Sequence, residues 1–116
     1  MIELIEMLEE LEEKYERQGW SETDFHKYWF ISHKMHNVAP KITPNTYKTK
    51  AILKKFLSYS DEDLPSVIVF AVTNHKTLRS VIPRYDCGIV SFCFNYPDIK
   101  HLASSKTNLS NESGVY

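Results

Sequence analysis

The stretch from Phe25 to Ser58 contains no acidic residue, and its residue types suit a chemical task better than those of any other part of the chain. Its seven lysines are Lys27, Lys34, Lys41, Lys48, Lys50, Lys54 and Lys55. The aromatic residues among them are Tyr28, Trp29, Phe30 and Tyr47. Lysines neutralise phosphates, and exposed aromatic rings stack on unpaired bases. The pattern predicts a nucleic-acid-binding surface formed by Lys27, Trp29, Lys34, Lys48, Lys50, Lys54 and Lys55.

The net charge of −1 conceals an uneven distribution of charge along the chain. Met1 to Asp24 holds nine acidic and two basic residues, a net charge of −7, whereas Phe25 to Ser58 has a net charge of +7. Two simpler interpretations therefore remain open beside nucleic-acid binding. The lysines either face water or balance the acidic N-terminal segment within the fold.

Other kinds of site have weaker support. His26, His33 and His36 lie within eleven residues, but a structural zinc site needs four converging ligands, usually in tight pairs. The chain has three glycines and neither a nucleophile elbow nor a glycine-rich phosphate loop. Cys87 and Cys93 are read as small buried residues in a reducing compartment. We expect no metal, no cofactor and no nucleophilic catalysis.

An apolar run, Ser66 to Thr73, is predicted to organise the fold. Its residues are rich in Val and Ile, which favours a strand buried on both faces. A helix-like segment, Asn74 to Ile82, and a second apolar run, Gly88 to Phe94, follow it. This order predicts a small α/β domain with a mostly parallel βαβ core.

The remaining segments are predicted as follows. Ile2 to Gln18 forms an amphipathic helix, with leucines and a tyrosine on one face. The conformation of Ser21 to Asn37 is left open. Its capping-box pattern favours a helix, whereas the block Tyr28-Trp29-Phe30-Ile31 favours a strand. A further helix is expected from Pro44 to Ser58, with Thr43 as its N-cap. With 116 residues, the chain suits one domain, residues 1–102, and a polar C-terminal tail, residues 103–116.

From Tyr47 onward, the order of elements resembles the C-terminal half of the PD-(D/E)XK nucleases, the restriction-endonuclease-like superfamily. The matching segments are Tyr47 to Leu57 as a basic helix, Val67 to Val72 as a strand, His75 to Pro83 as a short helix and Gly88-Ile89-Val90 as a closing strand. The match covers about half of the chain. The resemblance implies a nuclease-like core.

In that family, carboxylates on a strand hold a divalent metal and a lysine orients the attacking water. Lys27 to Lys34 would be the corresponding strand, where Ser32 stands in the place of the metal-binding acid. Asp24 and Lys34 are the candidates for the remaining acid and the lysine. Because a serine does not replace a carboxylate, the resemblance fits a degenerate core that binds without cutting. Mg²⁺ or Mn²⁺ is expected only if the chain is an active nuclease.

The sequence thus predicts a small non-catalytic nucleic-acid-binding protein. One alternative is a protein-binding regulator or inhibitor, encoded by a virus or mobile element, which docks on a larger complex through the acidic N-terminal helix or the C-terminal tail. A second alternative is a metal-dependent nuclease. No apolar run reaches the roughly 20 residues that span a bilayer, so a cytoplasmic protein without membrane contact is expected. DNA versus RNA, and monomer versus homodimer, are left open.

Overall fold

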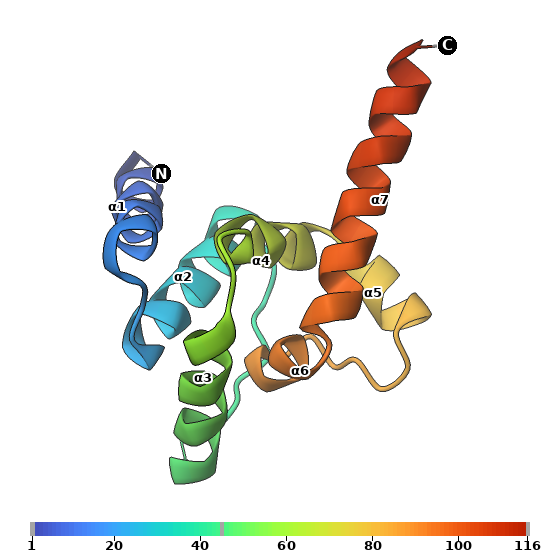
Figure 1. Ribbon diagram of the computed structural model, residues 1–116. Helices are drawn as coiled ribbons and strands as arrows, with labels where there is room; N and C mark the ends of the chain where they lie inside the picture. The colour runs from blue at the N-terminus through green and yellow to red at the C-terminus, as the bar shows by residue number, and fades with distance from the viewer. Residues whose placement is uncertain (1, 45, 116) are drawn as a thin grey trace.

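The structure is a computed structural model that describes residues 2–44 and 46–115, with side chains as far as residue 105. Helices connected by turns and loops make up the described part of the chain, and no strand occurs in it (Figure 1). The helices are α1 (Ile2–Gln18), α2 (Glu22–Met35), α3 (Tyr47–Tyr59), α4 (Leu64–Thr73), α5 (His75–Val81), α6 (Ile89–Phe94) and α7 (Tyr96–Val115). The predicted α/β fold with a parallel βαβ core is therefore wrong.

Both predicted strands are helices. In α4 the buried residues Leu64, Val67, Ile68, Ala71 and Val72 recur at helical spacing, so one face packs inward while Ser66 and Thr73 stay exposed. Pro65 occupies the first turn of α4, where its missing N–H is no disadvantage. The weak helix propensity of Val and Ile costs only a few tenths of a kcal/mol per residue, which burial of this face outweighs.

The second predicted strand, Gly88 to Phe94, is wrong for the same reason. Residues 88–94 contain α6, whose buried residues Ile89, Phe92 and Cys93 have the spacing of a helix and not the alternation of a strand. The two strands on which the resemblance to the nuclease superfamily depended are thus helices.

The helix predictions fare better. The predicted bounds of α1 are confirmed, and the open segment after it is a helix that begins with the expected capping box, in which Ser21 and Asp24 bond reciprocally. α3 begins later than predicted, because Thr46 and not Thr43 is its N-cap. Residues 103–115, predicted as a polar tail, continue α7, which extends beyond the body of the molecule (Figure 1).

An aromatic cluster joins α2, α3, α6 and α7 in the core. Phe92 lies at its centre, with ring centroids 5.2 Å from Trp29, 5.6 Å from Tyr96 and 6.3 Å from Phe56. All four residues are buried. α1 lies at the edge of the body, where it packs on α2 and has no fully buried residue (Figure 1). None of the helices in the described residues is long and apolar enough to cross a membrane.

Candidate nucleic-acid interface

The packing of α3 determines which of its side chains face outward. Thr49, Leu53 and Phe56 are buried, at spacings of four and three residues, and they define the inward face of the helix. The four lysines of the helix are exposed: Lys48, Lys50, Lys54 and Lys55. Since no acidic residue occurs in α3, its outward side is a cationic face.

Two exposed tyrosines mark the ends of this cationic face. Tyr47, in the first turn of α3, is 88% exposed, and Tyr59, in the last turn, is 67% exposed. The Tyr59 ring makes an edge contact with the buried Phe56, at 5.7 Å between ring centroids, which holds it against the body. Sequence reasoning missed Tyr59 because the predicted helix and the predicted basic segment both end at Ser58, whereas α3 continues to Tyr59. We call Tyr47, Tyr59 and the four lysines the α3 face.

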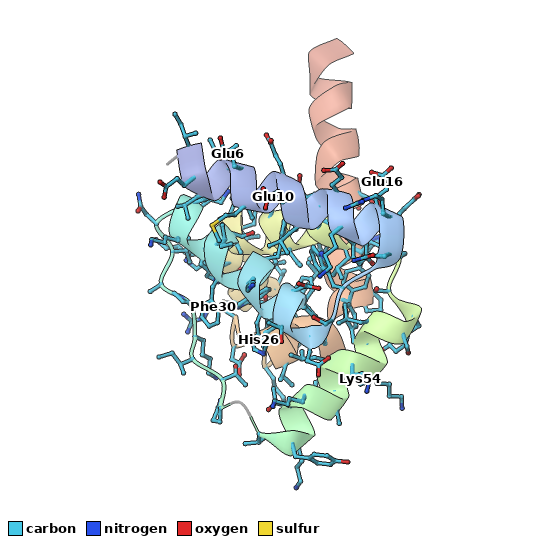
Figure 2. All side chains as sticks on the ribbon, turned by 90° about the vertical axis from the view of Figure 1, so that its left-hand side faces the viewer. Glu6, Glu10, Glu16, His26, Phe30 and Lys54 are labelled. Atoms are coloured by element: carbon cyan, nitrogen blue, oxygen red, sulfur yellow. The ribbon has the colours of Figure 1, made fainter. Side chains whose placement is uncertain are left out.

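The α3 lysines have no ion-pair partner among the described residues. Lys41, which belongs to the same seven-lysine stretch, is paired, with its Nζ 2.5 Å from Oδ2 of Asp86. The glutamates of α1 do not balance the α3 lysines by direct contact in the described part of the chain. Figure 2 shows the separation: Glu6, Glu10 and Glu16 lie along α1 at the upper edge, and Lys54 lies on α3 below.

Trp29 was predicted to stack on bases, and its position contradicts that role. Only 2% of the residue is exposed, and its ring lies against His33 and Phe92 in the core. Tyr28 is buried as well, and its hydroxyl donates a hydrogen bond to Glu12 of α1 at 2.5 Å. Burial raises the pKa of Tyr28, and the adjacent Glu12 carboxylate raises it further. These two rings hold the fold together and offer no stacking surface.

The other two predicted lysines lie on a different helix. Lys27 and Lys34 are exposed on α2, on either side of Phe30, which is 43% exposed. His26 stacks on Phe30, with ring centroids 6.2 Å apart and ring planes 17° apart (Figure 2). The exposed side of α2 is thus a smaller mixed surface, with fewer lysines than the α3 face.

The predicted nuclease-like pair, Asp24 and Lys34, is not brought together. The two residues are ten positions apart on α2, and a rise of about 1.5 Å per residue separates them by about 15 Å along the helix axis. Asp24 is buried and engaged by Lys14, with Nζ at 2.9 Å, and by Ser21. Burial alone would raise the pKa of Asp24, but these hydrogen bonds lower it below the ordinary value. The Asp24 carboxylate therefore caps the N-terminus of α2, whereas Lys34 is exposed to solvent.

The histidines and cysteines do not converge on a common point. No group of three or more His, Cys, Asp or Glu side chains with the arrangement of a metal site occurs in the described residues. His33 is buried, with Nδ1 2.7 Å from the carbonyl oxygen of Trp29, and burial lowers the pKa of its imidazole. Cys87 and Cys93 are both free thiols.

Comparison with known proteins gives no relative from which a role could be transferred: no family model, no curated protein and no solved structure matches the chain.

Proposed function

We propose that this protein binds single-stranded nucleic acid on the α3 face, without catalysis. The observation that carries the proposal is the composition of this face: Lys48, Lys50, Lys54 and Lys55 are exposed between two exposed tyrosine rings and have no ion-pair partner among the described residues. Lysines without carboxylate partners are free to replace the counterions of phosphates. Four of the lysines named from the sequence and Tyr47 share this helix with Tyr59, which supports the proposal.

The tyrosines favour single strands over duplexes. A base presents its flat face to a side chain only when it is unstacked, and base–aromatic stacking contributes about 1–3 kcal/mol per base. Tyr47 and Tyr59 are twelve residues apart, so their backbone positions are separated by about 18 Å along α3. The lysines occupy the interval between them. A short stretch of single strand lying along the helix would meet cationic and aromatic groups in turn.

The proposal is tested by fluorescence anisotropy with labelled single-stranded DNA and RNA oligonucleotides of mixed sequence and with the corresponding duplex. We expect the Lys54→Ala/Lys55→Ala variant to lose at least about tenfold in affinity at low salt. The matched control is Lys76→Ala/Arg79→Ala, which removes two exposed charges from α5. Its affinity is expected to change less than about threefold, because only the long-range field changes.

A second pair of variants distinguishes base stacking on the tyrosine rings from electrostatic attraction to the phosphates. Tyr47→Phe/Tyr59→Phe keeps both rings and is expected to bind as the parent chain does. Tyr47→Ala/Tyr59→Ala removes the rings and is expected to weaken single-strand binding by at least about tenfold, with little effect on the duplex. Absence of binding to every oligonucleotide at low salt would refute the proposed function. Equal losses of affinity in Lys54→Ala/Lys55→Ala and in Lys76→Ala/Arg79→Ala would refute the assignment to α3.

A further inference from the structure

A second surface feature lies at the N-terminal side of α3, between two loops. A groove of about 520 Å³ is lined by the segment 41–44, which precedes α3, and by residues 83–95, which include α6. Two of its lining side chains are large, apolar and strongly exposed: Ile42 at 82% and Phe94 at 69%. Val90 and Pro83 add further apolar lining. The groove therefore presents apolar surface that the fold itself does not cover.

The walls of the groove are fixed by a polar framework. The carboxylate of Asp86 accepts a hydrogen bond from Lys41 Nζ at 2.5 Å, which connects the two loops, and one from the backbone N–H of Gly88 in its own loop at 2.8 Å. Gly88 allows this approach, since a Cβ there would lie 3.0 Å from Asp86 Oδ1 and 3.3 Å from Thr43 Oγ1. Arg84 also lines the groove and has no carboxylate partner within the described residues. The groove thus combines exposed apolar groups with the guanidinium of Arg84, for which the described residues offer no carboxylate partner.

The chain carries a segment with the complementary chemistry. On α1, Ile2 is 72% exposed and Ile5 is 40% exposed, because Leu8 and Leu11 form the face that packs on the core. A spacing of three residues places the two isoleucines on the same side of the helix, as in helices that dock in grooves. The remaining outward positions of α1 are largely glutamates: Glu3, Glu6, Glu9, Glu10, Glu13 and Glu16.

We propose that the first turns of α1 dock in this groove on a second copy of the chain. Ile2 and Ile5 then cover Ile42 and Phe94, and the glutamates beside them face Arg84. The contact is between copies, since α1 lies across the body from the loop that connects α5 and α6 (Figure 1). Because each copy offers one helix and one groove, the contact is head-to-tail and assembly grows with protein concentration.

Sedimentation velocity at about 10 μM to about 1 mM protein, without an N-terminal tag, tests this proposal, since that range brackets the affinities of small transient interfaces. We expect the average mass of the parent chain to rise with concentration. Ile42→Ala/Phe94→Ala removes the groove's apolar groups, and Ile2→Ala/Ile5→Ala removes those of the helix. Each variant is expected to associate at least about tenfold more weakly, with an unchanged helical circular dichroism spectrum.

Mixing the two variants is the decisive arm of the experiment. One variant keeps an intact helix and the other an intact groove, so an equimolar mixture is expected to form a 1:1 dimer that neither forms alone. Val81→Ala, at a residue that is 52% exposed on α5, is the control for loss of exposed apolar surface and is expected to associate normally.

Two results would overturn the self-association proposal: a parent chain that stays monomeric up to about 1 mM, or a mixture that stays monomeric while the parent associates. The outcome is independent of the proposed nucleic-acid binding. Lys54→Ala/Lys55→Ala is expected to leave self-association within about twofold of the parent, and Ile42→Ala/Phe94→Ala is expected to leave oligonucleotide binding unchanged.

Discussion

Two phenylalanines on α6 provide a sharp test of the helical fold. Phe92 is completely buried and its ring contacts those of Trp29, Phe56 and Tyr96, whereas Phe94 is 69% exposed. Phe92→Ala removes a core ring, and such substitutions lower the free energy of unfolding by about 3–5 kcal/mol. Phe94→Ala is expected to change it by no more than about 0.5 kcal/mol. A loss of the first size is a large part of the 5–15 kcal/mol typical of a domain.

Urea unfolding of dilute protein, followed by circular dichroism, measures both effects. With a typical denaturant slope, the Phe92→Ala midpoint is expected to fall by roughly 2 M urea, while that of Phe94→Ala stays close to the parent value. The comparison distinguishes a helix from a strand at this position, because residues two positions apart share one face of a strand but lie on different sides of a helix. Similar losses in the two variants would refute the helical α6 and the packing around it.

Two further predictions concern the contacts made by Asp61. Burial alone would raise the pKa of Asp61, but hydrogen bonds from Lys100 and Tyr96 lower it below the ordinary value. The ionised Asp61 carboxylate therefore stabilises the folded state above the unfolded pKa of about 3.9, and this stabilisation is lost as the pH falls through the folded pKa. In urea unfolding, Asp61→Asn is therefore expected to be less stable than the parent at pH 7 and to approach it in acid; an unchanged difference across pH would contradict this assignment. The hydroxyl of Tyr15 bonds both the Ser60 hydroxyl at 2.8 Å and the carbonyl oxygen of Asp61 at 2.5 Å, so Tyr15→Phe is expected to cost about 1–2 kcal/mol. Tyr47→Phe is the exposed control, and equal stability of the two tyrosine variants would show that these bonds contribute little.

The sequence predicted those helices whose signals were local and redundant. α1 has both a long apolar stripe and a glycine after its last residue, and α2 has a capping box in which Ser21 and Asp24 do bond. α4 and α6 could not be assigned in this way. The two helices are only ten and six residues long, and short apolar runs rich in β-branched or aromatic residues do not distinguish a buried helix from a buried strand. Tertiary burial decided their conformation.

The candidate site was predictable in its charges but not in its aromatic groups. Lysines are rarely buried without a partner, so the exposure of Lys48, Lys50, Lys54 and Lys55 followed from their identity. An aromatic ring can lie in the core or on the surface, and only the packing shows which. Trp29 proved to be a core residue, while Tyr59, outside the predicted segment, is exposed beside the lysines.

The salt dependence of oligonucleotide binding tests the central claim most directly. Four lysines on a single strand give a slope of about −2.8 for the logarithm of affinity against the logarithm of salt concentration, which is roughly a 50-fold loss between 50 and 200 mM salt. The Lys54→Ala/Lys55→Ala variant is expected to halve this slope to about −1.4, and Lys76→Ala/Arg79→Ala is expected to leave it unchanged. Binding that is independent of salt, or a slope that is the same in all three proteins, would contradict nucleic-acid binding by the α3 face.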